Sequence, residues 1–379
     1  MYFIILLGIV SLFGDITYEG ARSVTGPYLA RLGASAGIVG LVAGIGEFIG
    51  YALRLASGYL ADRTNAYWLL TFIGYGLILA IPLLAFAGYW QLAAVFIILE
   101  RMGKAIRSPA RDTMLSYATK EVGRGWGFGI HEALDQVGAI IGPVIFFLVF
   151  LSNRGYYEGF TILWIPALLT LVVLAIARRR VPSPQKLEAR GETEGQNVQR
   201  KLPKAFWLYT IFTLFSVAGF ANFQLISYHL KVQSVIPDAQ IPIIYAIAMG
   251  VDAVAALLIG RTYDKVGPIS LIAVPLLTLP IPFLVFSYSY KLVLIGMVLW
   301  AVVMGIQETI MRAAIADLTP IVRRGFAYGV FNTAYGGAWF LGSAFMGMLY
   351  DISINYLILF VILMECISIP VFLSIRRAA

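Results

Sequence analysis

Long runs of apolar residues, separated by short polar segments, dominate this sequence. A run of about 20 apolar residues is long enough to cross the hydrocarbon core of a bilayer as one helix. Runs of this kind recur along nearly the whole chain of 379 residues. They predict twelve helices, near residues 2–28, 37–61, 67–88, 92–115, 127–151, 158–177, 205–229, 241–260, 268–288, 292–318, 325–349 and 356–375.

The composition agrees with a membrane protein. Hydrophobic residues make up 60% of the chain and charged residues 13%, whereas soluble domains carry roughly 25% charged residues. The twelve windows leave no room for a separate soluble catalytic domain. The single cysteine, Cys366, cannot form an intramolecular disulfide. We therefore predict an all-α membrane protein.

The basic residues favour one orientation in the membrane. The net charge is +8, but the 28 Lys and Arg residues do not form one stripe, which argues against nucleic-acid binding. With an even number of spans, both termini lie on the same side. Seventeen of the basic residues fall on that side, four on the other and seven within the spans. Because basic loops stay in the cytoplasm, we expect both termini to be cytoplasmic.

One polar segment divides the windows into two sets of six. Residues 178–204 are rich in Pro, Gly and charge, so they cannot bury a core. We interpret them as a cytoplasmic linker between six-helix bundles at 1–177 and 205–379. Two parallel repeats predict a substrate site at their interface and alternating access by rocking of the bundles. The repeated segments are Gly58–Arg63 with Gly260–Lys265, and Gly125–Gly129 with Gly325–Gly329.

The loop after the second window carries a family motif. Gly58-Tyr-Leu-Ala-Asp62-Arg63 resembles the motif G-x-L-a-D-R-x-G-R-R of the major facilitator superfamily, although Asn65, Ala66 and Tyr67 replace its later glycine and basic residues. The resemblance covers essentially the whole chain and implies the twelve-helix major facilitator fold. We expect Asp62 to accept hydrogen bonds from a helix N-terminus of the other bundle and so to gate the cycle. We also expect Arg63 to pair with Asp112.

Two further segments resemble motifs of the exporters in this family. Arg101-Met-Gly-Lys104-Ala105 is similar to the R-x-x-Q-G motif of proton-coupled members, and Gly138-Ala-Ile-Ile-Gly142-Pro143 is similar to the G-x-x-x-G-P motif of antiporters. The combination resembles prokaryotic drug:proton antiporter-like exporters. Small residues at this spacing also serve close helix packing, and a proline also kinks a helix, without any role in transport.

Ionisable residues inside the spans are candidates for chemistry, because each costs about 2.5–3.5 kcal/mol at the centre of a membrane helix. Asp15, Glu19 and Arg22 are spaced i, i+4 and i+7, so they share one face of the first span. Their counterparts in the second half are Val217, Ala221 and Gln224, so the charges favour the N-terminal half.

We assign the candidate residues to three roles. Proton coupling is expected at Asp15, Glu19 and Asp135. The residues expected to line the substrate cavity are Arg22, Arg101, Lys104, His131, Glu132, Asn222, Gln224, Glu308, Arg312, Asn332 and Tyr335. The residues expected to gate the cycle are Gly58, Asp62, Arg63, Arg107, Arg111, Asp112, Gly138, Gly142, Pro143 and Asp264.

Each charged group also has a structural interpretation. Burial favours the neutral acid and a nearby cation favours the carboxylate, so Glu19 can exchange a proton when its neighbours move. A permanent internal ion pair would instead only hold the helices in register. His131 with Asp135 and Glu132 fits a metal site or a proton relay. We favour the relay, because no third convincing metal ligand is evident.

The sequence therefore predicts a secondary transporter, most simply one that couples proton entry to export of small amphipathic or drug-like organic molecules. The alternative is a transporter of an anionic metabolite, since Arg22, Arg101, Lys104 and Arg312 can bind a carboxylate or phosphate. A sensor or an intramembrane enzyme is a third class, but no nucleophile constellation or Walker-type sequence is present. We expect a non-enzymatic monomer without metal or cofactor, in the plasma membrane of a prokaryote, whose partners are a small molecule, protons and lipid.

Overall fold

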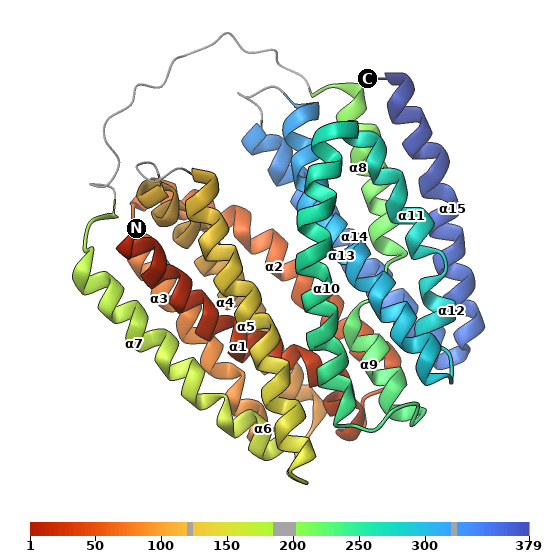
Figure 1. Ribbon diagram of the computed structural model, residues 1–379, viewed down its shortest axis with the longest axis horizontal. Coiled ribbons are helices and arrows are strands. Elements are labelled where there is room, and N and C mark those ends of the chain that lie inside the picture. The colour runs from red at the N-terminus through yellow and green to blue at the C-terminus, as the bar shows by residue number, and fades with distance from the viewer. Residues whose placement is uncertain (120–123, 185–201, 320–323, 379) are drawn as a thin grey trace. The chain divides into compact units, whose positions relative to one another are not determined.

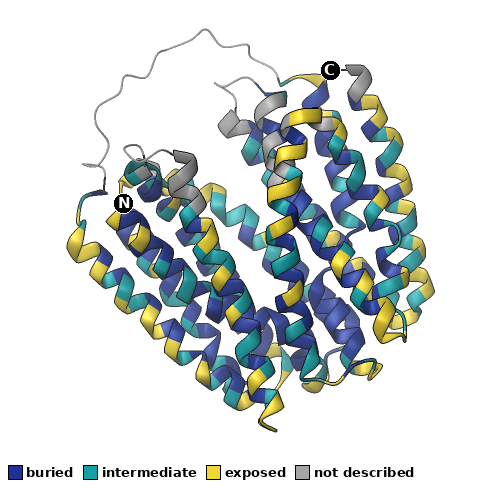
Figure 2. Cartoon of the chain, in the orientation of Figure 1, coloured by how far each residue is buried: buried dark blue, intermediate teal, exposed yellow. Residues whose placement is uncertain are grey.

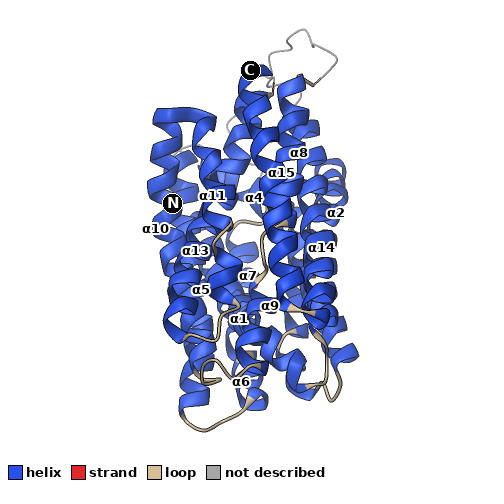
Figure 3. Cartoon of the chain, turned by 90° about the vertical axis from the view of Figure 1, so that its right-hand side faces the viewer, coloured by secondary structure: helices blue, strands red, loops and turns tan. Residues whose placement is uncertain are grey.

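The structure is a computed structural model that describes residues 1–119, 124–184, 202–319 and 324–378. In these ranges each predicted window is helical, and no β-strand occurs among the described residues (Figure 1, Figure 3). The elements are α1 Tyr2–Arg31, α2 Ala36–Thr64, α3 Tyr67–Gly76, η1 Leu77–Ala80, η2 Pro82–Phe86, α4 Trp90–Thr119, α5 Arg124–Leu151, α6 Tyr156–Ile162, α7 Trp164–Arg180, α8 Lys204–Ala218, α9 Phe223–Val232, α10 Gln240–Val266, η4 Gly267–Ile272, α11 Ala273–Thr278, α12 Ile281–Val285, α13 Tyr290–Leu318, α14 Arg324–Ile352 and α15 Ile354–Ala378.

Several windows contain consecutive shorter helices. Proline explains two of the interruptions, because it lacks the backbone N–H that continues a helix and is tolerated in the first turn of the next one. Pro82 begins η2 and Pro282 lies in the first turn of α12. Between α8 and α9 the chain leaves the helix at Gly219 and re-enters it after Asn222, whose side chain caps α9.

Within the described part of the chain, nine helical segments are long and apolar enough to cross a membrane. α4 is not one of the nine, and the charges of Glu100, Arg101, Lys104 and Arg107 explain why its hydropathy is too low. The count of twelve spans and the cytoplasmic position of both termini remain predictions.

Exposed residues recur along the helices (Figure 2). Many of them are large and apolar, which suits contact with lipid. Large apolar residues three or four positions apart share one helix face. In water, a continuous exposed stripe of this kind would be unfavourable. The exposed large apolar residues of α7 are Ile165, Leu168, Leu169, Val172 and Ile176, and those of α15 include Leu359, Leu363, Ile367 and Leu373.

The chain divides into two compact units. The first comprises Met1–Gly33, Ile49–Thr193 and Asp238–Ala246, and the second comprises Ala34–Phe48, Glu194–Pro237 and Ile247–Ala379. The start of α2 thus groups with the second unit, and the start of α10 with the first. The predicted linker at 178–204 lies mostly outside the described residues.

In the first unit, α1 is the central element and packs against α4, α5 and α7. Its side chains contribute to an apolar core with α3, α4 and α7, which includes Leu7, Tyr75, Met114 and Leu174. Because α1 is surrounded by other helices, most of its residues are buried, including several polar ones.

In the second unit, the start of α2 packs closely on α14. A Cβ atom on Gly44 would lie 2.8 Å from the Phe340 carbonyl oxygen, so this contact requires glycine. The two carboxylate oxygens of Asp351 accept hydrogen bonds of 2.9 and 2.8 Å from the backbone N–H groups of Ala36 and Gly37. Asp351 therefore caps the N-terminus of α2 from the end of α14, where a negative charge is favourable.

Replacing Asp351 with alanine is expected to leave these two N–H groups unpaired and to destabilise the second unit. Loss of a helix cap of this kind costs about 0.5–2 kcal/mol. Thermal unfolding of the purified protein in detergent measures the effect. Asp351→Asn keeps one carbonyl acceptor and should fall between the wild type and Asp351→Ala. Equal melting temperatures for all three proteins would contradict the capping role.

Candidate functional site

Glu19, the first candidate for proton coupling, is a buried carboxylate on α1. Its Oε1 lies 3.5 Å from a guanidinium nitrogen of Arg22. Its Oε2 accepts a hydrogen bond of 2.7 Å from the hydroxyl of Tyr245, on the part of α10 that belongs to the first unit. All three side chains are buried. Glu19 and Arg22 thus share a face, as the spacing predicts, and Tyr245 is an additional partner.

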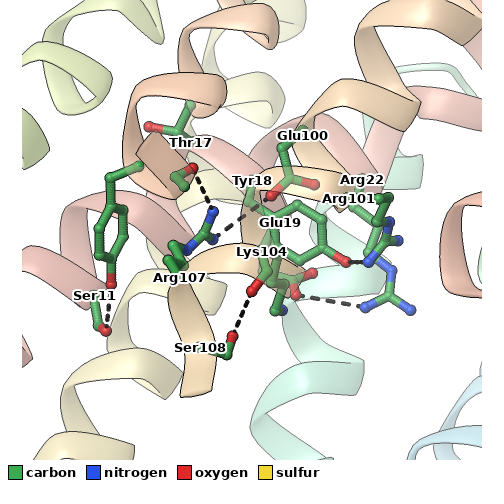
Figure 4. A network of polar contacts seen from close by, with 12 residues as sticks. Ser11, Thr17, Tyr18, Glu19, Arg22, Glu100, Arg101, Lys104, Arg107 and Ser108 are labelled. Carbon is green, nitrogen blue, oxygen red and sulfur yellow. Dashed lines mark hydrogen bonds and ion pairs between the residues drawn. The ribbon is translucent and has the colours of Figure 1, made fainter. Parts of the chain in front are cut away.

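Three cations surround the ring of Tyr18, which precedes Glu19 on α1 (Figure 4). The centroid of this ring lies 4.2 Å from the Lys104 ammonium, 4.6 Å from the Arg101 guanidinium carbon and 5.9 Å from that of Arg22. Arg101 also donates a hydrogen bond to the Tyr18 hydroxyl. Cation–π attraction offsets part of the cost of burying these charges. The structure therefore brings together three of the residues predicted to line the cavity.

Arg107, predicted to act in gating, is only 2% exposed. Its Nη2 lies 3.6 Å from Oε1 of Glu100, and its guanidinium carbon lies 4.6 Å from the ring centroid of Tyr75 on α3. α3 and α4 approach closely here, because a Cβ on Gly74 would lie 2.7 Å from the backbone nitrogen of Arg107. Arg107 thus links α4 to α3 inside the first unit (Figure 4).

Arg111 connects three acceptors. Its Nη2 lies 2.9 Å from the Asp112 carboxylate and its Nη1 lies 4.0 Å from the Asp135 carboxylate on α5. Its Nη1 also donates a hydrogen bond of 2.8 Å to the hydroxyl of Ser11 on α1. One guanidinium therefore joins α1, α4 and α5.

The expected pairing of Arg63 with Asp112 is wrong. Asp112 pairs with Arg111, and the Nη1 of Arg63 donates a hydrogen bond of 3.1 Å to the Tyr59 hydroxyl one turn earlier on α2. Asn65 follows with a positive φ of 52°. Asparagine is one of the few non-glycine residues that adopt this left-handed conformation readily. This explains how Asn65 replaces the glycine of the family motif.

His131 lies at the centre of a hydrogen-bonded chain. Its Nε2 is 3.1 Å from Ser11 Oγ, and Ser11 Oγ is 3.1 Å from the Tyr75 hydroxyl. On the other side of the ring, Nδ1 lies 3.5 Å from Oδ2 of Asp135. Glu132 is exposed and lies near Gln136 instead, so the structure does not bring it to His131. No group of three His, Cys, Asp or Glu residues suited to a metal ion occurs among the described residues.

Asp15 lies at the contact between α1 and α5. Its Cβ is 3.1 Å from the position that a Cβ on Gly138 would take. The carboxylate is only partly buried and lies within the electrostatic field of Lys104, Arg107 and Arg111.

The glycines of the predicted antiporter motif bring α5 against the backbone of α1. A Cβ on Gly142 would lie 2.6 Å from the backbone nitrogen of Gly20 and 2.9 Å from its Cα. A Cβ on Gly138 would lie 2.5 Å from the Leu12 carbonyl oxygen. Pro143 follows within the helix. Gly58 is less crowded, because a Cβ there would make ordinary contact with Pro109 at 3.6 Å. Close packing is therefore what the motif provides in this structure.

The candidates in the second unit have diverse surroundings. Asn222 is buried, and its Oδ1 accepts a hydrogen bond of 2.8 Å from the Leu225 backbone N–H. Tyr335 is buried and donates a hydrogen bond of 3.2 Å to Oε1 of Gln307. Gln224 is buried, Asn332 is partly exposed and Glu308 is exposed. The side chains of Asp62, Asp264 and Arg312 lie outside the described residues.

Sequence reasoning missed several polar residues of the two units. Ser11, Tyr18, Tyr75 and Tyr245 are uncharged and common in membrane helices, so no local pattern selected them. Glu365 did carry a signal, because it is a carboxylic acid inside the apolar run of α15, and it is 0% exposed.

The family model of the Major Facilitator Superfamily matches residues 5–272 and 229–378. The chain belongs to this superfamily. It is 41% identical over 379 residues to an uncharacterized protein of Mycobacterium tuberculosis, covering 99% of this chain and 93% of the relative. It is 28% identical over 359 residues to an uncharacterized MFS-type transporter of Methanocaldococcus jannaschii, covering 92% and 88%.

The fold is similar to that of solved transporters. A bacterial homologue of the human lysosomal transporter Spinster, in an inward-facing and occupied conformation, superposes with a TM-score of 0.76 at 14% identity, covering 100% of this chain and 97% of that chain. The major facilitator fold predicted from the motifs is thus supported by independent comparisons. This facilitator is a multi-pass membrane transporter of the cell membrane.

Proposed function

We propose that this facilitator is a proton-coupled secondary transporter that works by alternating access and exports small amphipathic or drug-like organic molecules. The observation that carries the proposal is the environment of Glu19. A buried charge is costly unless it is paired. Between described residues, Glu19 pairs with the cation Arg22 and accepts a hydrogen bond from the hydroxyl of Tyr245. A movement that separates these partners makes proton uptake by Glu19 favourable.

In the proposed cycle, Glu19 and Asp15 take up protons from outside. Protonation removes the charge attraction between Glu19 and Arg22 and turns one Glu19 oxygen from an acceptor into a donor. Arg22 and the neighbouring ring of Tyr18 then change their contacts, and substrate is released. The gating residues near Asp62 follow as the predicted bundles rock inward.

The chain from Asp135 through His131 and Ser11 to Tyr75 supports a role in proton movement. Imidazole and hydroxyl groups both donate and accept hydrogen bonds, so a proton can pass along such a chain by successive transfers. The contacts of 3.5, 3.1 and 3.1 Å link α5, α1 and α3. Asp135 is the third proton-carrying candidate in this proposal, beside Glu19 and Asp15.

One observation favours the second candidate function, transport of an anionic metabolite. Lys104 lies 4.2 Å from the Tyr18 ring centroid, and none of the ion pairs found between described residues includes Lys104. An ammonium group without a carboxylate partner can bind an anionic group of a substrate. Arg101 and Arg22, which contact the same ring, would add to this attraction.

The two proposed functions predict that different classes of compound drive proton movement in reconstituted vesicles. We expect that cationic or neutral amphipathic compounds, added under an imposed pH gradient, trigger proton movement opposite to their own flux. A pH-sensitive dye inside the vesicles measures it. Anionic compounds should be inactive under the main proposal. Substrate flux without proton movement would contradict proton coupling.

Replacing Lys104 with an uncharged residue also distinguishes the two proposed functions. Under the main proposal, Lys104→Met retains flux of cationic compounds and gains no anion transport. If anions are the substrates, Lys104→Met should reduce their binding roughly tenfold or more, as expected for loss of a charged hydrogen bond worth about 1.5–3 kcal/mol. Scintillation proximity binding with a labelled anion measures the difference. Selective loss of anion binding would contradict the main proposal and support transport of an anionic metabolite.

A further inference from the structure

Glu365 on α15 is a fully buried carboxyl group that the proposed cycle does not use. It is 0% exposed. Its Oε2 accepts hydrogen bonds of 3.3 Å from the hydroxyls of Ser216 on α8 and Ser368 on α15. The Ser368 hydroxyl also donates a shorter bond of 2.8 Å to the backbone carbonyl of Glu365. Its Oε1 is also buried and has no hydrogen-bond partner among the described residues. One oxygen of the carboxyl group is therefore available for a further interaction.

Glu365 lies beside the interruption between α8 and α9, and Figure 3 shows α8 and α15 side by side. Its Oε1 is only 2.8 Å from the position that a Cβ on Gly219 would take, so a larger residue there would displace the carboxyl group. Two other groups at the interruption are paired with side chains. The Trp300 indole N–H donates a hydrogen bond of 2.8 Å to the Ala221 carbonyl, and Asn222 caps the start of α9.

A negative charge on Glu365 would be unfavourable at this place. α8 ends at Ala218, and the last carbonyl groups of a helix lack intrahelical donors and carry partial negative charge. An ionised Oε1 would face this end and would have no donor. A protonated Oε1 would instead present an O–H to it, which is the donor that a helix C-terminus needs.

Among the residues whose side chains the structure describes, no cation pairs with Glu365. The elements packed against α15 are α8, α14, α11, α12 and η4. Of these, η4, α11 and α12 contain no ionisable residue. On α8 and α14, none of the ionisable residues with described side chains makes a hydrogen bond or ion pair with Glu365. Those residues are Lys204, Tyr209, Tyr328, Tyr335, Tyr350 and Asp351, and Arg324 lies outside the described side chains.

From this geometry we infer that Glu365 is a further proton-binding site, located in the second unit, and that it holds its proton on Oε1 at neutral pH. The ligand is a proton and not a metal ion, because one carboxyl group and two donating hydroxyls cannot supply the six or more oxygen ligands that hard cations prefer. The acid group joins α15 to the end of α8 and stabilises the interruption. This inference goes beyond the proposed function and stands without it.

Infrared spectroscopy of the full-length protein in lipid at neutral pH tests the inference directly. A protonated carboxyl group has a C=O stretch that is separate from the carboxylate bands. We expect the wild type minus Glu365→Gln difference spectrum to show one lost acid C=O band. Glu158→Gln, which makes the same change at the partly exposed cap of α6, should lose intensity only in the carboxylate bands. Loss of carboxylate bands in Glu365→Gln would overturn the inference.

A second pair of variants keeps the test valid if Glu365→Gln does not fold. Ser216→Ala and Ser368→Ala each remove one hydrogen bond to Oε2 and leave Glu365 in place. Each should shift the acid C=O band to higher frequency, because the carbonyl oxygen loses a donor. An acid band that stays at the wild-type frequency in both variants would show that it does not come from Glu365 and would overturn the inference.

Discussion

Replacing Glu19 with glutamine is expected to reduce proton-coupled flux to the level of protein-free vesicles. Glutamine has nearly the same shape and keeps an oxygen that can accept the 2.7 Å hydrogen bond from Tyr245. It cannot bind or release a proton at physiological pH. If Glu19 is the proton carrier, substrate movement and proton movement are lost together.

The experiment compares wild type and Glu19→Gln in vesicles with an imposed pH gradient, following internal pH and labelled substrate in parallel. Glu158→Gln is the matched control, because it makes the same chemical change at a carboxylate that caps α6 through the Gly155 N–H. The control should keep wild-type flux. A Glu19→Gln protein that still exchanges protons for substrate would refute the assignment.

A structural role for Glu19 must be separated from a proton-carrying one. Removing one partner of a buried ion pair costs about 3–5 kcal/mol, because the other charge is left uncompensated. Glu19→Gln alone can therefore lose activity through instability caused by Arg22. Adding Arg22→Met removes that charge. If Glu19 only holds Arg22 in place, the double variant should recover the melting temperature and show the same proton-coupled flux as Arg22→Met alone. If Glu19 carries the proton, stability returns but the double variant has less coupled flux than Arg22→Met alone.

Replacing Gly142 with alanine is expected to destabilise the packing of α5 against α1. The added Cβ would lie 2.6 and 2.9 Å from backbone atoms of Gly20, closer than such atoms approach in folded proteins. Backbone atoms cannot turn aside as a side chain can, so α5 must move away from α1. Overpacking of this kind costs about 1–3 kcal/mol, and a lower yield of folded protein is also expected.

A glycine with open space around it provides the control for Gly142→Ala. Gly76 ends α3 with helical φ and ψ of −61° and −37°, and no described atom lies within 4 Å of a Cβ built there. Gly76→Ala should therefore raise stability by about 0.5–1 kcal/mol. Thermal unfolding and size-exclusion profiles of the two variants measure the effects. Equal melting temperatures for Gly142→Ala and wild type would contradict the close contact between α1 and α5.

The helical windows could be predicted from the sequence because helix formation in lipid depends only on the residues of the run itself. A run of apolar residues must bury its backbone polar groups in its own hydrogen bonds within lipid, so it forms a helix wherever it occurs. The break between α8 and α9 at 219–222 was not predicted from the sequence. Gly219 and Asn222 lie within a run of residues that is apolar on average, so the run was predicted as one continuous helix.

Charged residues within spans could also be selected from the sequence, because an ionisable side chain at any position of a span is costly in lipid until it finds a partner. The shared face of Glu19 and Arg22 followed from helix geometry alone. The partner of Asp112 was predicted wrongly, because a short pairing within α4 competes with one across helices, and the sequence does not give the distance to Arg63.

By itself, the sequence determined that this chain is a helical membrane protein with ionisable groups concentrated in its N-terminal half, since hydropathy and helical periodicity act over a few turns. Only the tertiary structure decided which groups meet. Tyr245 binds Glu19 from 226 positions away, and Ser216 binds Glu365 from 149 positions away. Such contacts depend on how whole helices pack, because packing sets which faces approach and a hydroxyl group in a span carries no signal of its partner.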